Sequence, residues 1–281
     1  MASGTDVTVP YGFLPINLIG GQVFAGSTRM YPIQYGYATD IFYGDFVKVV
    51  RGSLTRVSIE STTDSNALTG VFFGCSYTDP VTKTKRFSQY WPASTLAGDA
   101  VAYVVDDPDT VFKAAVCSAT TVMASGAYAM IGTNLACINN TGNVNTGNSK
   151  NAILAPTATP ATSILPLRCV GVVPETSLSY TATGSSSSTT ITLTGSGLPA
   201  AIPVGTSVAY RASNGQVIET GSFVTAAAAA GDTSVTLNAA VAVPGGVTAI
   251  PSGATIIFTV YRELLVKLNV LTHGYYSSVT A

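Results

Sequence analysis

Aspartates are the residues of this chain whose type and spacing could do chemistry. Asp106, Asp107 and Asp109 stand together in the stretch VVDDPD. Three carboxylates this close in sequence could share a calcium ion, which takes several oxygen ligands. Asp-Pro-Asp after an apolar run is also typical of an ordinary turn. The sequence leaves both interpretations of Asp106, Asp107 and Asp109 open.

Asp45 and Asp99 each follow a glycine and precede alternating apolar residues, in YGDFVKVV (43–50) and AGDAVAYVV (97–105). Two carboxylates could serve glycoside hydrolysis if both lined one cleft at a controlled separation. Gly-Asp also forms turns, because glycine adopts positive φ and aspartate hydrogen-bonds to nearby main chain. Since nothing else places the two carboxylates in a cleft, we interpret both pairs as turns that start strands.

Other catalytic groups are scarce. His273 is the single histidine, so a Ser-His-Asp triad would depend on it alone. Cys75, Cys117, Cys137 and Cys169 are scattered without a C-x-x-C pair, so they give no zinc-ligand spacing and instead predict buried, small apolar side chains. No phosphate-binding glycine motif is present. The sequence therefore predicts a protein that is not an enzyme and needs no metal or cofactor.

The composition points to contacts with other proteins. Hydrophobic residues make up 47% of the chain and charged residues 10%, whereas about 25% charged is usual. A net charge of -1 offers no electrostatic basis for binding nucleic acid or an anionic membrane. We expect no signal peptide and no membrane span. The one basic run, TKTKRF (82–87), is typical of a solvated loop.

The elements that carry these residues are predicted to be strands. Short apolar runs alternate with polar residues between Gly, Pro, Ser and Thr turns, which is the pattern of an all-β protein. We expect a β-barrel or sandwich core formed by residues 41–175 and 261–281. AAAAAG (226–231) is too short for a stable helix, so we expect a loop or a single turn. The expected core strands lie in residues 41–50, 54–61, 70–77, 99–107, 110–117, 128–139 and 167–175.

Residues 1–40 are predicted to form an extended N-terminal arm. Pro10, Pro15 and Pro32 disfavour helix and central strand there. The large apolar residues of the arm cannot bury themselves within it, so the arm must lie on its own core or on a neighbouring subunit, and both remain open. Aromatic side chains are common at protein interfaces. The candidate interface residues are Tyr11, Phe13, Ile16, Leu18, Phe24, Tyr31, Tyr35 and Tyr37.

Residues 176–260 are predicted to form an inserted β domain. They carry only three charged residues and open with a Ser/Thr/Gly tract, SLSYTATGSSSSTT (177–190), which we interpret as a flexible linker. The charged pattern of the core resumes at residue 261. Because insertions are tolerated at exposed loop tips, the domain should project from the core.

An internal repeat organises the inserted domain. TITL (190–193) matches SVTL (234–237), and AIPVG (201–205) matches AIPSG (249–253). Each unit reads as strand, loop, Ile-Pro-x-Gly turn, strand. Two units of one type predict a small pseudo-symmetric domain in which each half covers the apolar face of the other.

Several phrases of the chain resemble capsid-associated structural proteins of tailed bacteriophages, especially those of aquatic bacteria. The resemblance spans roughly the first 175 residues and the closing strand at LLVKLNVL (264–271). The inserted domain, with IPVGTSVAY and IPSGATIIF, is similar to small β modules of phage virion proteins and is not a regular part of that family. The phrases that carry the resemblance are YGFLPINLIGGQVFAGSTRMYPIQYGYATDIFYGDFVKVV, GVFFGCSYTDP, FSQYWP and GDAVAYVVDDPD.

The resemblance implies a capsid decoration, or cement, protein. Such a protein is a β-barrel-like subunit, usually a homotrimer, that binds the capsid exterior of the virion and clamps neighbouring copies of the major capsid protein after synthesis in the host cytoplasm. We then expect removal of residues 1–38 to abolish capsid binding and leave a folded core. The alternative is a tail or fibre protein whose inserted domain binds a host glycan, which the neutral Ser/Thr-rich insert favours.

Overall fold

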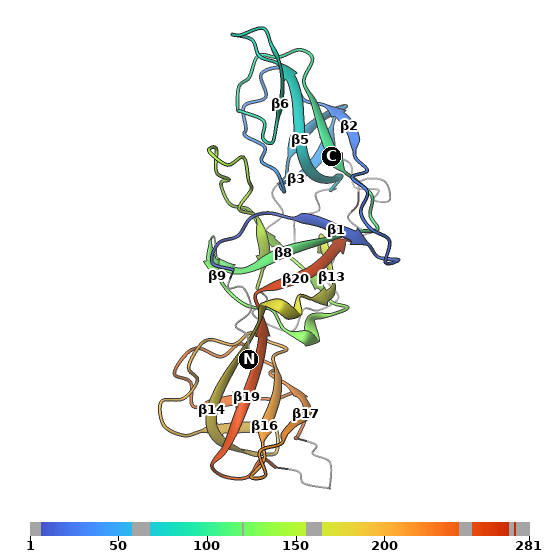
Figure 1. The fold of residues 1–281 in the computed structure, drawn as a ribbon. Coiled ribbons are helices and arrows are strands. Elements are labelled where there is room, and N and C mark those ends of the chain that lie inside the picture. Colours follow the sequence, from blue (N-terminus) through green and yellow to red (C-terminus); the bar gives the residue numbers. More distant parts are fainter. Residues whose placement is uncertain are drawn as a thin grey trace.

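The structure is a computed structural model that describes residues 7–57, 68–119, 121–155, 165–241, 249–269 and 273. It contains twenty strands and two short 3-10 helices among these residues, so the predicted all-β class is confirmed. The strands form three sheets. Figure 1 shows them as three β units stacked along one long axis, which we call the upper unit, the middle unit and the distal barrel.

The upper unit is a nearly closed barrel. Its strands pair in the order β2-β7-β5-β3-β4, with β6 added on β5. A parallel bridge between Ile33, just after β2, and Leu54 in β4 brings the two edges of the sheet together. Trp91, Ile41 and Phe72 are fully buried inside it. The strands are β2 (Arg29–Pro32), β3 (Phe46–Val50), β4 (Ser53–Arg56), β5 (Gly70–Thr78), β6 (Lys85–Ser88) and β7 (Val101–Val105).

The middle unit is a mixed sheet in the order β10-β13-β20-β8-β12-β11, with β1 and β9 also paired to β8. Its core is continuous with that of the upper unit, since Phe46 and Val71 of the upper sheet pack in one cluster with Phe112 and Leu264. The strands are β1 (Leu14–Leu18), β8 (Thr110–Ala119), β9 (Val122–Met123), β10 (Asn134–Leu135), β11 (Cys137–Ile138), β12 (Ala152–Leu154), β13 (Leu167–Val172) and β20 (Glu263–Leu268).

The distal barrel has a separate core. Its sheet runs β17-β16-β19-β14-β15-β18, and an antiparallel bridge from Val224 to Leu237 connects the two ends. The sheet therefore closes on an interior formed by residues such as Ile191, Val208 and Phe258. The strands are β14 (Ser177–Ser187), β15 (Thr190–Leu193), β16 (Ser207–Arg211), β17 (Val217–Phe223), β18 (Ser234–Thr236) and β19 (Ala254–Tyr261).

The two repeats of the distal barrel are related by a pseudo-two-fold axis. β15 pairs antiparallel with its repeat partner β18, centred on Ile191 opposite Val235. β16 pairs antiparallel with its repeat partner β19, centred on Ala209 opposite Ile257. The predicted domain of two similar β units is therefore observed, and equivalent strands face each other across the axis.

Two expectations about local structure are wrong. The tract 177–190, interpreted as a flexible linker, contains β14, the longest strand of the described chain. Its residues alternate between more exposed and more buried positions, because Leu178, Tyr180 and Ala182 pack on the barrel core. The stretch 128–139 is not one strand, since the 3-10 helix Tyr128–Met130 and the two-residue strands β10 and β11 divide it.

The expected loop at 226–231 is observed. No helix forms in this alanine run, and Ala228 makes an isolated bridge with Ile202. Of the expected strand 54–61, residues 54–56 lie in β4, while residues 58–61 fall outside the described residues.

Candidate interaction surface

The N-terminal arm is positioned by a close crossing of two glycines. Gly12 and Gly44 both have positive φ, at 87° and 90°. A Cβ atom on Gly44 would lie 2.9 Å from the Phe13 nitrogen, and the Phe13 N–H donates to the Gly44 carbonyl over 3.2 Å. Only glycine allows the two main chains to approach this closely. The arm is thereby fixed against the turn that starts β3.

Phe13 fastens the arm to the chain's own core. Its side chain is fully buried, and its ring lies 4.3 Å from that of Phe46. β1 follows directly and pairs with β8. The first of the two open possibilities, packing on its own core, is thus observed for this part of the arm. Phe13 is not accessible to another chain, so its assignment as an interface residue is wrong.

Tyr11 and Phe24, two further candidate residues, also contact their own chain. The Tyr11 hydroxyl donates to the Glu263 carboxylate, and burial raises the pKa of that phenol. Phe24 packs edge-on against Phe73, with ring centroids 6.3 Å apart. These contacts are intramolecular, and they hold the arm against Glu263 of the middle unit and Phe73 of the upper unit.

Tyr31 and Tyr37 anchor the arm on the upper unit. The Tyr31 hydroxyl donates to the Asp106 carboxylate over 2.9 Å, and the Tyr37 hydroxyl accepts the Arg56 main-chain N–H over 2.9 Å. Both rings also pack on the core of the upper unit. Each keeps only a partly exposed edge.

The remaining candidates keep accessible surface. Tyr35 is 61% exposed and Ile16 38% exposed, while Leu18 is half-buried. Ile16 lies in β1 on the middle unit, whereas Tyr35 follows β2 on the upper unit. The eight residues therefore do not form a single patch, and the interface role of the accessible ones stays a prediction.

Sequence reasoning missed several exposed apolar side chains of the same arm. A hairpin after β1, closed by the bridge from Asn17 to Val23, carries Ile19 and Val23 into solvent, and Val23 is 81% exposed. A signal was available in the Gly-Gly turn at 20–21, which marks a hairpin tip. We define the arm surface as the exposed apolar residues Val9, Ile16, Ile19, Val23, Met30 and Tyr35.

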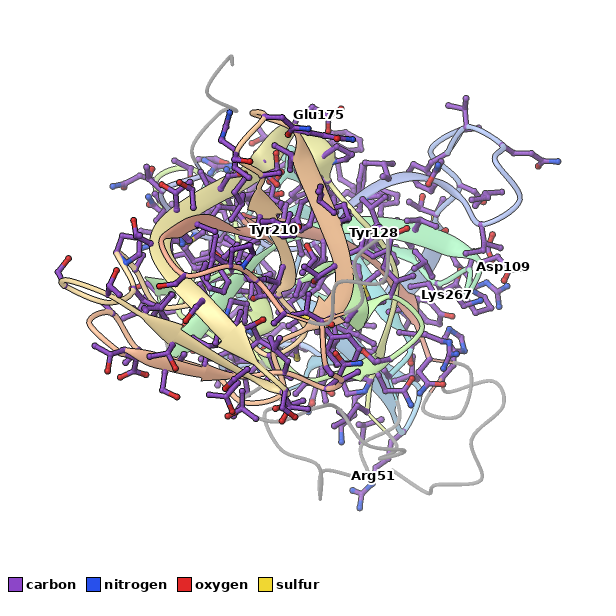
Figure 2. All side chains as sticks on the ribbon, turned by 90° about the horizontal axis from the view of Figure 1, so that it is seen from below. Arg51, Asp109, Tyr128, Glu175, Tyr210 and Lys267 are labelled. Atoms are coloured by element: carbon purple, nitrogen blue, oxygen red, sulfur yellow. The ribbon has the colours of Figure 1, made fainter. Side chains whose placement is uncertain are left out.

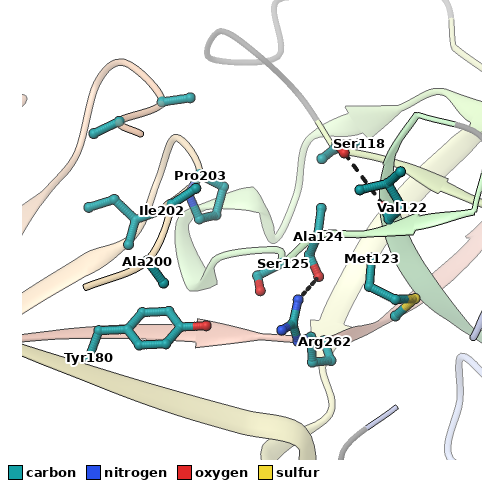
Figure 3. Close-up of a pocket in the computed structure, with 14 residues that line it drawn as sticks. Ser118, Val122, Met123, Ala124, Ser125, Tyr180, Ala200, Ile202, Pro203 and Arg262 are labelled. Carbon is teal, nitrogen blue, oxygen red and sulfur yellow. Dashed lines mark hydrogen bonds between the residues drawn. The ribbon is translucent and has the colours of Figure 1, made fainter. Parts of the chain in front are cut away.

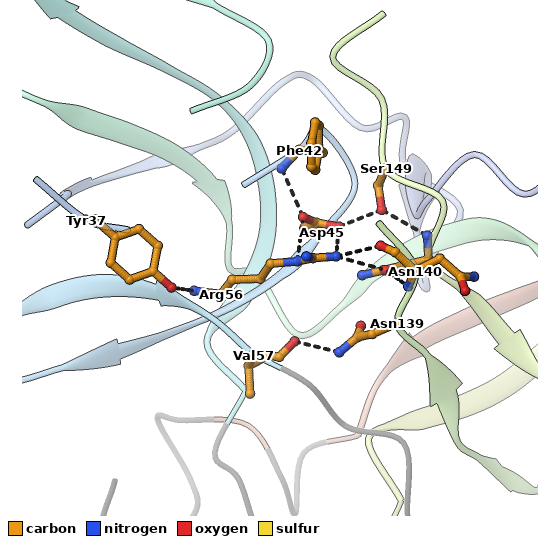
Figure 4. Close-up of polar contacts among 9 residues, drawn as sticks. Tyr37, Phe42, Asp45, Arg56, Val57, Asn139, Asn140 and Ser149 are labelled. Atoms are coloured by element: carbon orange, nitrogen blue, oxygen red, sulfur yellow. Dashed lines mark hydrogen bonds and ion pairs between the residues drawn. The ribbon is translucent and has the colours of Figure 1, made fainter. Parts of the chain in front are cut away.

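The Asp45 carboxylate stabilises the fold through an ion pair and hydrogen bonds. It is fully buried and lies 2.9 Å from the Arg56 guanidinium Nε. It also accepts the Phe42 main-chain N–H over 2.9 Å and the Ser149 hydroxyl over 2.6 Å. Arg56 in turn donates to the Asn140 carbonyl over 2.7 Å. Figure 4 shows how this network joins the turn before β3 to the loop around Asn140.

Asp99 is engaged in a different turn. Its carboxylate accepts the N–H and hydroxyl of Thr78 and pairs with the Lys85 ammonium at 2.8 Å. The hydrogen bond from Lys85, followed by those from Thr78, holds the pKa of Asp99 below its usual range. The two Gly-Asp pairs thus serve as turn elements with separate partners. Arg86 of the basic run likewise pairs with Asp79 at 2.9 Å.

The three neighbouring aspartates do not converge. Asp106 pairs with Arg29 at 3.1 Å, and Asp109 pairs with Lys267 at 3.3 Å. Asp107 accepts the Asp109 main-chain N–H. Within the described parts of the chain, no group of three or more His, Cys, Asp or Glu side chains is placed to hold a metal ion.

The remaining candidate groups are buried. His273 is fully buried, forms a parallel bridge with Leu68, and its Nε2 lies 3.0 Å from the Asp106 carbonyl. Burial lowers the pKa of this imidazole. The four cysteines are free and buried, as predicted, and burial raises the pKa of the Cys75 thiol to about 12.

A pocket of about 430 Å3 lies between the middle unit and the distal barrel. Figure 3 shows its mainly apolar wall, with the Tyr180 ring on one side and Arg262 on the other. The Arg262 guanidinium donates to the Ala124 carbonyl over 3.0 Å. The described residues that line this pocket include no carboxylate and no histidine, so they do not supply the carboxylate pair on which glycoside hydrolysis depends.

Comparison of the chain with protein-family models, curated proteins and solved structures gave no match in any of the three. Among the described residues, no helix has the length and apolar character needed to cross a membrane.

Proposed function

We propose that the protein is a capsid decoration protein that binds the outside of a phage shell and stabilises contacts between copies of the major capsid protein. The observation that carries the proposal is the arm surface. Exposed apolar side chains extend along the arm from the middle unit to the upper unit, while internal contacts fix the arm itself. An ordered arm with several exposed apolar side chains suits binding by surface burial rather than by a pocket.

The energetics favour such a mode of binding. Burial of apolar surface contributes about 25 cal/mol per Å2. Because the arm is already ordered by Phe13 and the Gly12–Gly44 crossing, little further ordering entropy would be lost on binding. A homotrimer would present three such arms, and the joint attachment would exceed the affinity of a single one.

Shell binding by charged variants tests this proposal. In a co-sedimentation assay with shells of the major capsid protein, we expect Val23→Asp combined with Tyr35→Asp to weaken binding at least about tenfold, since each carboxylate would lose hydration in an apolar contact. Val217→Asp is the matched control, because Val217 is 45% exposed on the distal barrel. Equal binding by the double variant and the wild type would contradict the assignment of the arm surface.

A second candidate function is host-glycan binding by a tail or fibre protein. It is favoured by the distal barrel, which has its own core and projects from the end of the molecule (Figure 1). This alternative predicts that loss of the distal barrel abolishes adsorption to cells. Decoration by the arm surface predicts that shell binding survives loss of the barrel and that cell adsorption does not depend on it.

A further inference from the structure

The pocket between the middle unit and the distal barrel is formed mainly by small side chains. Six of its described lining residues are alanines, and two of these come from the alanine run 226–231. Alanine leaves space that a larger residue would fill, and the volume of about 430 Å3 lies in the range of about 300–1,000 Å3 typical of small-molecule sites. The six are Ala124, Ala155, Ala200, Ala201, Ala227 and Ala228.

Main-chain hydrogen bonds hold the two walls of the pocket together. Gly126 and Tyr261 exchange two such bonds, of 2.7 and 2.9 Å. Their neighbours in sequence, Ser125 and Arg262, both line the pocket. The Arg262 main-chain N–H also donates to the Thr176 carbonyl over 3.2 Å, directly before the first strand of the barrel. A ligand would therefore meet walls that are already in place, which limits the ordering entropy lost on binding.

The polar side chains of the pocket decide which ligand it can take. Arg262 is the single charged side chain among the described lining residues, and its guanidinium donates to the Ala124 carbonyl over 3.0 Å. The Tyr180 hydroxyl points toward the Arg262 side of the pocket (Figure 3). A guanidinium recognises a carboxylate through charge-assisted hydrogen bonds. The pocket thus combines an apolar wall with one positive charge.

Two carboxylates that contact β20 or its start are engaged outside the pocket. Glu263 accepts the Tyr11 hydroxyl and lies 3.6 Å from the Lys113 ammonium. Asp109 pairs with Lys267 at 3.3 Å, and Figure 2 shows these two side chains next to each other. Neither carboxylate lines the pocket. The described lining residues therefore leave the negative charge to a ligand.

We propose that this pocket binds a medium-chain fatty acid, a small anion with an apolar body. The alkyl chain would lie on the alanine wall and the carboxylate beside the Arg262 guanidinium, so that burial of apolar area and a charge-assisted hydrogen bond act together. A ligand in this position contacts both units. It would stabilise their docked arrangement by mass action. The inference goes beyond the proposed function and does not depend on it.

Calorimetric titration of the full-length protein with decanoate, kept below its micelle concentration, tests the proposal. We expect saturable binding to one site. Decanamide keeps the alkyl chain and lacks the charge, so it should bind at least about tenfold more weakly. Ala227→Trp should weaken decanoate binding at least about tenfold, because the indole would occupy the pocket that Ala227 lines.

Ala230→Trp is the matched control. Ala227 and Ala230 are both exposed alanines of the same run, but Ala230 does not line the pocket. Ala230→Trp should bind decanoate as the wild type does. Equal melting temperatures of the two variants without ligand exclude unfolding as the cause of lost binding.

NMR of the methionine methyl groups locates the ligand without any substitution. The Met123 signal should shift with decanoate because Met123 lines the pocket, whereas the signal of Met30, which is 67% exposed on the arm surface, should not. A shift of Met30 alone would overturn the proposal, because the ligand would then lie on the arm.

The calorimetric results can overturn the proposal in three further ways. Decanoate may show no saturable binding, decanamide may bind as tightly as decanoate, or Ala227→Trp and Ala230→Trp may bind decanoate equally. Self-association of the free protein that Ala227→Trp abolishes would overturn it as well, because the occupant of the pocket would then be a second copy of the chain.

Discussion

At the residue scale, single groups hold the arm and the chain end on the core. Gly44 is required twice, for its positive φ and for the close approach of Phe13. His273 fixes the chain after β20 against the upper unit through the Asp106 carbonyl. Both residues lie far in sequence from what they contact, and each can be tested by one substitution.

Gly44→Ala is expected to lower the free energy of unfolding more than Gly52→Ala. Gly52 has a similar φ of 83°, but a Cβ atom there meets nothing within 4 Å. Gly52→Ala should therefore cost about 1–2 kcal/mol from backbone strain alone. Gly44→Ala should cost about 1–3 kcal/mol more, because its Cβ atom crowds the Phe13 nitrogen.

Urea denaturation of the two variants measures this difference. Equal losses of stability in Gly44→Ala and Gly52→Ala would contradict the role given to the crossing. A larger loss in Gly52→Ala would contradict it as well.

Stability is expected to fall as the pH drops below about 6.5, because of His273. Burial lowers the pKa of this imidazole in the folded state, although Asp106 and Asp107 act in the opposite direction. Below the unfolded pKa the unfolded chain binds more protons than the folded chain, so protonation favours unfolding. The loss between pH 7.5 and pH 5.5 should not exceed about 1.4 kcal/mol, which is the limit for an imidazole that stays unprotonated in the folded state.

His273 is the single histidine of the chain, so a loss of stability near pH 6.5 can be assigned to it. Urea denaturation of the wild type and of His273→Gln at both pH values provides the measurement. The variant should be less stable at pH 7.5 but should lose little further stability at pH 5.5. A variant that loses as much as the wild type between the two pH values would place the titration elsewhere.

Some of these sites could be predicted from the sequence and others could not. The turn role of Asp45 follows from local chemistry, since its carboxylate accepts an N–H three residues earlier. The burial of Phe13 depends on the crossing of Gly12 over Gly44, which joins segments that no local pattern connects. Exposure of an arm residue likewise depends on tertiary packing. The sequence therefore predicted the same interface role for Phe13, which is buried, and for Tyr35, which is exposed.

At the element scale, alternation proved more informative than composition. The tract 177–190 has the composition of a linker but the period of a strand, and it pairs with both β15 and β19. Only every second side chain of this strand faces the barrel core, so Ser and Thr can occupy the exposed positions between them. The repeat at 190–193 and 234–237 could be predicted because equivalent strands have similar residues. The closure of the barrel could not be predicted, because it depends on a bridge between Val224 and Leu237 that no sequence pattern indicates.

The distal barrel is expected to be dispensable for folding of the other two units. Its first and last strands begin and end side by side, with Ser177 paired to Tyr261, and its core is separate. Replacement of residues 178–260 by a short Gly-Ser linker should leave a cooperatively unfolding protein whose four cysteines all remain, since none lies in the barrel. Thermal unfolding followed by circular dichroism measures this, and loss of a cooperative transition would contradict it.

Deletion of the arm has the opposite expectation. Removal of residues 1–38 was predicted to leave a folded core. In the structure this deletion removes the buried Phe13 and the strands β1 and β2, so we expect it to destabilise the core. Substitution of exposed arm residues is therefore the suitable test of binding. The arm is part of the core on one side and available for contact on the other.

At the scale of the whole molecule, three β units are stacked along one axis (Figure 1). The residues of the arm surface lie on both the upper and the middle unit, whereas the distal barrel has a core of its own. Only 10% of the residues are charged, which is consistent with a surface that contacts other proteins.

The most direct test of shell decoration is the copy number of the protein in purified virions, measured by quantitative mass spectrometry against the major capsid protein. The account predicts a ratio near one copy per major capsid subunit, as repeated decoration of the shell requires. A handful of copies per particle would contradict it and place the protein in the tail. Absence from virions would contradict both candidate functions.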